Sequence, residues 1–143
     1  MSARCCLLLL AAASLAADDP RKDLQNMQGT WTIESIEKDG KAMDKGDLKN
    51  RRVIIQGNRY TVKDGEQVLD AGTYKLDTSK SPRWIDISPS FGPNAGKTLL
   101  GIYQLQGDER AICYGNPGGE RPKAFTTRPE TGQVFIIYKR VKK

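Results

Sequence analysis

Apolar and polar residues alternate along most of the chain, and this two-residue period predicts β-strands with two different faces. The clearest example is residues 97–122, in which two apolar runs, residues 98–105 and 109–114, are joined by Gly107 and Asp108. A Gly-Asp pair between two such runs is typical of a tight hairpin turn. We expect the other strands to be neighbours of this hairpin in one antiparallel sheet.

Further short strands are predicted by the same pattern, and turn signals of Gly, Asp and Asn separate them. In one of them Tyr60 and Val62 face one way while polar neighbours face the other, which indicates a half-buried strand. The hairpins follow one another without long crossovers, and the total is about eight strands. The remaining predicted strands are residues 29–36, 52–56, 59–63, 67–76, 83–88 and 133–141.

The strand at residues 67–76 contains a glycine that makes its inner face ambiguous. Tyr74 fits the inner face. In a regular strand Asp70 would join it there, whereas a bulge at Gly72 would turn Leu69 inward instead. Because an unpaired buried carboxylate is costly, the arrangement with the bulge is favoured.

A short helix is predicted before the first strand, since Asp19 can cap it and Pro20 suits the first helical position. An up-and-down sheet of eight strands can close into a barrel, which leaves no exposed edges. The interior of such a barrel is either filled by side chains or holds one small ligand. The sequence therefore predicts an all-β, eight-stranded antiparallel up-and-down barrel. An open two-sheet sandwich is the alternative, and it would need longer connections.

The first residues predict the cellular location of the protein. Arg4 is followed by an apolar run, residues 5–15, and by small residues up to Ala17. This order is typical of a secretory signal peptide, and the apolar run is too short for a stable membrane anchor. We expect residues 1–17 to be removed and residues 18–143 to form a single domain, exported to the periplasm or the cell exterior. A buried N-terminal helix is the alternative for the first segment.

Composition excludes several kinds of chemistry. The chain has no histidine, so Ser-His and Cys-His nucleophiles cannot form within it, and the commonest metal ligand is missing. We therefore predict no metal site, no cofactor and no catalytic residue. Beyond the predicted signal peptide Cys113 is the only cysteine, which excludes an intramolecular disulfide. Because Cys113 lies mid-strand between apolar residues, it is expected to be buried and unreactive.

The formal net charge is +6, and basic residues are concentrated in residues 139–143. They are not interleaved with aromatic residues along one face, so nucleic-acid binding is not expected. A weak attraction to an acidic partner in the cell envelope fits this charge better. Carboxylates such as Asp77 and Asp108 stand at predicted turns. Hydrogen bonds within the turns explain them better than acid–base hydrolysis of a glycoside.

A longer pattern extends over nearly the whole predicted mature chain. The short helix leads into Gly29-x-Trp31, and a basic residue, Arg140, closes the last strand. Between them stand further short motifs at ordered positions. They are Gly72-Thr73-Tyr74, Asp77, Pro82, Ile85-Asp86, Gly101-Ile102-Tyr103, Gly107-Asp108, Cys113, Arg121-Pro122 and Phe125.

The two ends of this pattern resemble the lipocalin (calycin) signature, in which an Arg of the last strand lies across a Trp at the closed end of the barrel. The whole pattern is similar to the small secreted lipocalin-like domains that are abundant in planctomycete bacteria, a family without an assigned activity. The resemblance implies the barrel and the export but no substrate. It also implies that Arg140 covers Trp31, in which case Arg140→Ala should cost about 1–2 kcal/mol.

Two functions fit such a barrel. The first is an exported, non-enzymatic and monomeric binding domain for a small apolar or amphipathic ligand, which an interior of roughly 300–1,000 Å³ would favour. The second is a protein-interaction or inhibitor domain with a filled core that acts through its loops, residues 89–96 and 115–128. A hydrolase that uses carboxylates is a weaker third hypothesis. The residues expected to line the interior are Tyr60, Tyr74, Ile102 and Tyr103.

Two basic residues of the second loop, Arg121 and Lys123, could bind an anionic head group or an acidic partner surface. Arg121 has a structural alternative, because an arginine often ties a loop to nearby carboxylates and carbonyl groups. In that case its partner would be Asp86 or Asp108.

Overall fold

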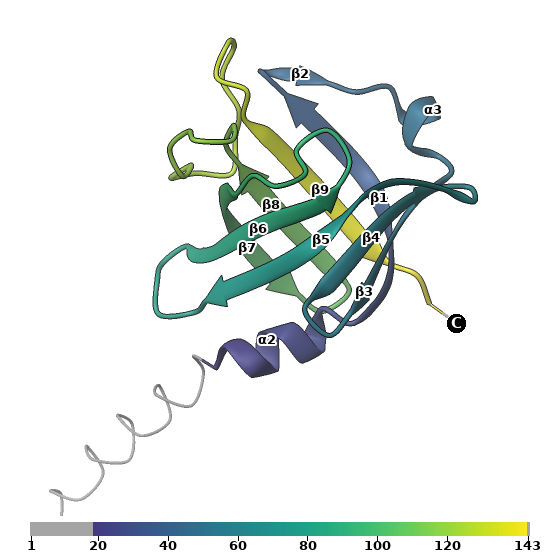
Figure 1. Ribbon diagram of the computed structural model, residues 1–143, viewed down its shortest axis with the longest axis horizontal. Coiled ribbons are helices and arrows are strands. Elements are labelled where there is room, and N and C mark those ends of the chain that lie inside the picture. Colours follow the sequence, from purple (N-terminus) through teal and green to yellow (C-terminus); the bar gives the residue numbers. More distant parts are fainter. Residues whose placement is uncertain (1–18, 143) are drawn as a thin grey trace, which may run out of the picture.

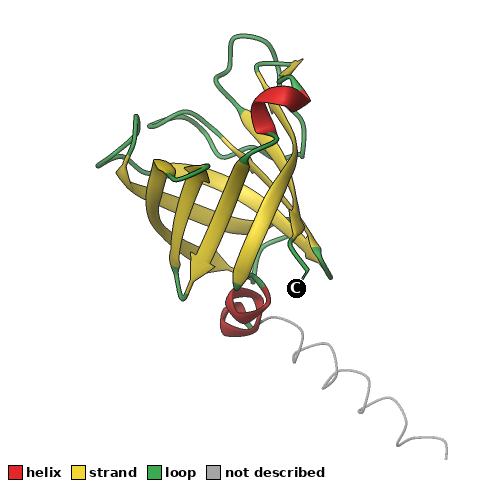
Figure 2. Ribbon diagram, turned by 90° about the vertical axis from the view of Figure 1, so that its right-hand side faces the viewer, coloured by secondary structure: helices red, strands yellow, loops and turns green. Residues whose placement is uncertain are grey.

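The computed structural model describes residues 19–142 of the chain. The predicted signal peptide, residues 1–17, lies outside the described residues. The fold is mostly β, with 52% of the residues in strands. Eight antiparallel strands close into a barrel, and a short helix stands near the N-terminus (Figures 1 and 2). The predicted fold class is confirmed.

Apart from the short strand β2, strands that follow one another in the chain are neighbours in the sheet, and all pairs are antiparallel. The elements in chain order are α2 (Pro20–Asn26), β1 (Gly29–Lys38), β2 (Lys41–Ala42), α3 (Lys45–Leu48), β3 (Arg51–Gln56), β4 (Arg59–Asp64), β5 (Gln67–Asp77), β6 (Arg83–Phe91), β7 (Leu99–Gln106), β8 (Glu109–Tyr114) and β9 (Val134–Arg140). β1 pairs with β9 as well as with β3, and this pairing closes the barrel. The short strand β2 pairs only with the far end of β1, beyond the part of β1 that pairs with β3.

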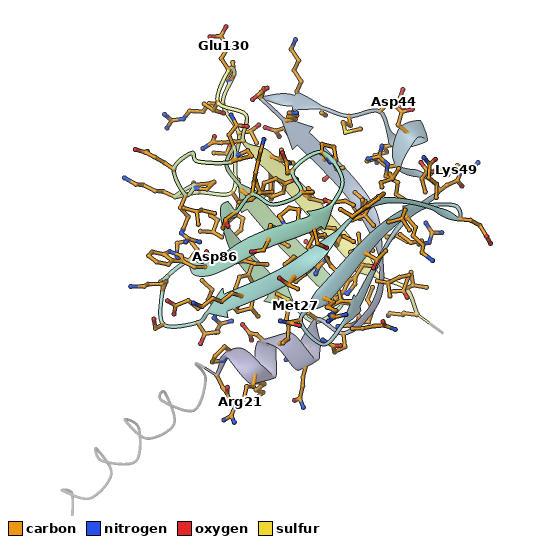
Figure 3. All side chains as sticks on the ribbon, viewed as in Figure 1. Arg21, Met27, Asp44, Lys49, Asp86 and Glu130 are labelled. Atoms are coloured by element: carbon orange, nitrogen blue, oxygen red, sulfur yellow. The ribbon has the colours of Figure 1, made fainter. Side chains whose placement is uncertain are left out.

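Helix α2 lies across one end of the barrel, which we call the closed end (Figure 2). The carboxylate of Asp19 accepts a hydrogen bond from the backbone N–H of Arg21, as expected of an N-cap, and Pro20 takes the first helical position. Just after the helix, Met27 is completely buried and lies between α2 and the barrel (Figure 3). The opposite end, where β3 begins and β6 leads into a loop, is the open end.

A buried polar contact fixes α2 to the barrel. The hydroxyl of Tyr103 donates a hydrogen bond of 2.6 Å to the carboxylate of Asp23. The guanidinium of Arg83 lies 3.3 Å from the same carboxylate. Since Asp23 is itself buried, these two partners compensate the loss of its hydration.

The register of β5 shifts at two points. Opposite β4, Leu69 has no partner residue, and opposite β6 the shift lies between Ala71 and Gly72. A bulge is therefore present, but Asp70 lines the interior together with Leu69 and Tyr74. The expectation that the bulge would turn Asp70 outward was wrong. The extra residue opposite β4 is Leu69, so the change of face falls between Val68, which is opposite Lys63, and Asp70, which is opposite Val62 and stays on the inner face.

Candidate functional site

A cavity of about 310 Å³ lies inside the barrel. All eight strands of the barrel contribute to its wall, which is mainly apolar. Its polar residues at the open end are Arg51, the first residue of β3, and Asp70. The lining residues are Ile33, Ile36, Arg51, Val53, Tyr60, Val62, Leu69, Asp70, Tyr74, Ile87, Pro93, Leu99, Ile112, Tyr114, Ile136 and Tyr138.

Two of the four tyrosines in this wall, Tyr60 and Tyr74, were expected from the sequence to line the interior. Their rings are stacked, with centroids 4.6 Å apart and an interplanar angle of 14°. Burial is the main cause that raises the pKa of both hydroxyls, and likewise those of Tyr114 and Tyr138. The four phenols therefore keep their protons at neutral pH and can donate hydrogen bonds into the cavity.

The carboxyl group of Asp70 lies near the open end of the cavity, 3.5 Å from the hydroxyl of Tyr60. Burial raises the pKa of this carboxyl, and hydrogen bonds from the Ala71 backbone and from Tyr60 only partly oppose that effect. The fold therefore favours the neutral form of Asp70 more than water does.

We expect Asp70→Asn to increase the free energy of unfolding at neutral pH. Because folding raises the pKa of this carboxyl, its ionisation opposes folding at every pH above the folded pKa. This cost disappears as the pH falls below 3.8, the ordinary value, since the carboxyl is then protonated in both states. Urea unfolding of the variant and the parent at about pH 7 and about pH 3 measures the difference in their free energies of unfolding at each pH. A variant that is no more stable than the parent at the higher pH would contradict this account.

The other two expected lining residues, Ile102 and Tyr103, do not line the cavity. The hydroxyl of Tyr103 is bound to Asp23 at the closed end, so this residue holds α2. Ile102 is next to Tyr103 in β7 and therefore faces the outside, beside its partner residue Cys113. The expectation that both residues share the interior was wrong, because neighbouring residues of a strand point to opposite faces.

Cys113 and its partner residue Ile102 lie on the outside of the barrel, and a long loop, residues 115–133, passes over Cys113. Both side chains are buried, and the thiol of Cys113 lies 3.5 Å from the carbonyl oxygen of Thr126. Burial raises the pKa of the thiol, which disfavours the reactive thiolate. Cys113 is thus buried as expected, and its lack of reactivity remains a prediction.

The same loop is tied down by Arg121. Its guanidinium donates a hydrogen bond of 2.8 Å to Asp86 and one of 2.7 Å to the carbonyl oxygen of Gly101. It also stacks over the ring of Trp84, 4.1 Å from the centroid. These contacts lie on the outer face of the barrel, where Asp86 is seen in Figure 3. Lys123 is exposed on the same loop, so neither basic residue joins the cavity.

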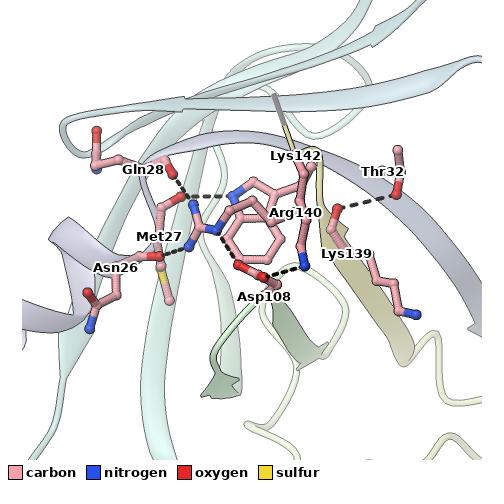
Figure 4. A network of polar contacts seen from close by, with 9 residues as sticks. Asn26, Met27, Gln28, Thr32, Asp108, Lys139, Arg140 and Lys142 are labelled. Atoms are coloured by element: carbon pink, nitrogen blue, oxygen red, sulfur yellow. Dashed lines mark hydrogen bonds and ion pairs between the residues drawn. The ribbon is translucent and has the colours of Figure 1, made fainter.

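The contact expected at the closed end is present. The guanidinium carbon of Arg140 lies 4.4 Å from the centroid of the Trp31 ring. Arg140 also donates hydrogen bonds to the carbonyl oxygens of Asn26 and Gln28 and pairs with Asp108 (Figure 4). It therefore fastens α2 to the end of β9 in addition to covering Trp31.

A second arginine near Trp31 was not predicted. Arg110 is 0% exposed, and its guanidinium carbon lies 4.9 Å from the Trp31 centroid and 4.1 Å from the centroid of Tyr138. The alternation of residues in β8 could have indicated that Arg110 faces inward, because Arg110 shares a face with Ile112 and Tyr114. Its place against Tyr138 depends on the register between β8 and β9, which the sequence does not show.

The outside of the barrel has a larger but open depression of about 550 Å³ beside the turn between β5 and β6. Lys80 and Arg83 contribute to its largely polar wall.

Within residues 19–142, no group of three or more His, Cys, Asp or Glu side chains is arranged to hold a metal ion. None of the helices in that part of the chain has the length and the apolar composition needed to cross a membrane. No protein-family model, curated protein or solved structure matches the chain.

Proposed function

We propose that the protein is an exported, non-enzymatic binding domain that holds a small apolar or amphipathic ligand inside its barrel. The observation that supports this function is the interior cavity of about 310 Å³. It falls at the lower end of the usual range for ligand pockets, roughly 300–1,000 Å³. An apolar wall with a few hydroxyl groups is also what such pockets generally present. The signal-like residues 1–17 support export. The resemblance to lipocalin-like domains is consistent with export and with ligand binding inside the barrel.

The alternative function, a filled barrel that acts through its loops, has less support. The loop of residues 115–133 is bound at several points, including hydrogen bonds of 2.5 Å from Thr127 to Glu37 and from the Gly132 backbone to Asp39. These bonds suit a loop that covers the apolar outer face of β7 and β8. The cavity favours binding in the interior instead.

The contacts of the turn carboxylates support a non-enzymatic role. Asp77 accepts hydrogen bonds from the backbone and the hydroxyl of Ser79, and these bonds lower the pKa of its carboxyl. Asp108 pairs with Arg140 and Lys142 at the end of the barrel. Each carboxylate is engaged in a turn or an ion pair, as expected of structural residues.

Fluorescence titration with 1-aminonaphthalene, a small neutral fluorophore, tests the proposed site. Val62 lines the cavity, so Val62→Trp should fill it and abolish saturable binding. Val68→Trp is the matched control, because Val68 is exposed and outside the cavity wall. Binding that survives Val62→Trp would place the ligand elsewhere. The natural ligand can be sought by native mass spectrometry of the protein isolated from its own cell envelope.

A further inference from the structure

The interior holds a positive charge that the proposed function does not explain. Arg110 is fully buried, and its Nε, Nη1 and Nη2 atoms have no hydrogen-bond partner in the described part of the chain. A guanidinium stays protonated in proteins, so this charge is present at every physiological pH. Stacking on Trp31 and Tyr138 offsets part of the lost hydration but supplies no hydrogen-bond acceptor.

Arg110 lies against the wall of the cavity. Tyr138, which stacks on its guanidinium, is one of the lining residues. Tyr74 is another, and the nearby guanidinium opposes the effect of burial on the pKa of its hydroxyl. Tyr74 is a neighbour of Arg110 and not its hydrogen-bond partner, because none of the three guanidinium nitrogens of Arg110 forms a hydrogen bond within the described residues. An oxyanion bound by the tyrosine hydroxyls would therefore lie next to a buried cation.

The opposite end of the cavity is different. Asp70 lies there, and any ionised fraction of its carboxyl would repel an anion. Arg51 also lies there, but 26% of its side chain is exposed and its guanidinium is 3.9 Å from Asp64. Solvent and a carboxylate thus reduce the field of Arg51, whereas Arg110 has neither. The closed end of the cavity is therefore more positive than the open end, and this difference would attract an anionic group toward the closed end.

We propose that Arg110, together with Tyr74 and Tyr138, is the acid-binding end of the cavity, and that the ligand is a monocarboxylate with an apolar tail. The inference rests on the proposed function. The carboxylate would accept hydrogen bonds from the tyrosine hydroxyls at the closed end, beside the charge of Arg110, and the tail would lie along the apolar wall. A molecule of liquid water occupies about 30 Å³, and a methylene group fills a similar volume. The 310 Å³ of the cavity therefore accommodate on the order of ten non-hydrogen atoms.

Isothermal titration of the full chain with octanoate and with 1-octanol tests this assignment. The two molecules have tails of the same length, but only octanoate carries a charge at neutral pH. We expect octanoate to bind the parent protein roughly ten- to a hundredfold more tightly, the effect of a few charge-assisted hydrogen bonds. This comparison needs no variant, so it holds even if a substitution at Arg110 prevents folding.

Arg110→Met should remove the preference for octanoate and leave the affinity for 1-octanol nearly unchanged. Methionine is a suitable replacement because it is unbranched and apolar, and thermal unfolding will show whether the variant folds. Arg51→Met is the control and should keep the preference. Equal binding of both molecules, or a preference that depends on Arg51, would overturn this inference and leave the proposed function standing. If neither molecule binds, the proposed function fails as well.

Discussion

Replacing Arg140 by alanine is expected to lower the free energy of unfolding by about 3 kcal/mol. The sequence alone suggested a smaller loss, because it indicated only the contact with Trp31. In the structure the guanidinium also donates to the carbonyl oxygens of Asn26 and Gln28, at the end of α2. Asn26 is the last residue of α2, so its carbonyl group has no partner within the helix, and the variant would remove the side chain that holds this helix end and Gln28 to β9.

Lys142→Ala provides a matched control for this prediction. Lys142 pairs with the same carboxylate, Asp108, but 79% of its side chain is exposed, so its loss should cost less than about 0.5 kcal/mol. Arg140→Lys should lie between the two, since it keeps the charge but loses the planar fork. Urea unfolding gives the three values. If Arg140→Ala is as mild as Lys142→Ala, the closed end does not depend on this residue.

Arg121→Ala is expected to cost about 2–3 kcal/mol. The substitution would remove the pair with Asp86, the hydrogen bond to the Gly101 carbonyl and the stacking over Trp84. It would also release the loop of residues 115–133 from the outer face. Chemical denaturation measures the loss of stability, and binding of 1-aminonaphthalene to the folded fraction should not change.

Lys123→Ala separates the structural role of Arg121 from a ligand-binding role of the loop. Lys123 is exposed on the same loop, so its substitution should change stability by less than about 0.5 kcal/mol. If Arg121→Ala left stability intact and weakened ligand binding, the loop would be part of the binding site. The contacts of Arg121 point to the opposite result.

Several elements of the fold could be predicted from signals between neighbouring residues. The hairpin of β7 and β8 follows from two apolar runs around Gly107 and Asp108, and the start of α2 follows from Asp19 and Pro20. These signals are local, because turn geometry and helix capping are decided within a few residues. The closed barrel was also predictable, since eight strands that pair in sequence order leave two edges that can pair.

The set of side chains that reach the interior depends on long-range pairing and packing. The extra residue in β5 leaves Asp70 on the inner face, and Ile102 is buried on the outer face, beside Cys113. Arg110 lies beside Trp31 and Tyr138 because β1, β8 and β9 meet at the closed end. Alternation assigns a residue to one of two faces. Strand register and loop packing then decide what each face contacts, and both arise from pairings between distant segments.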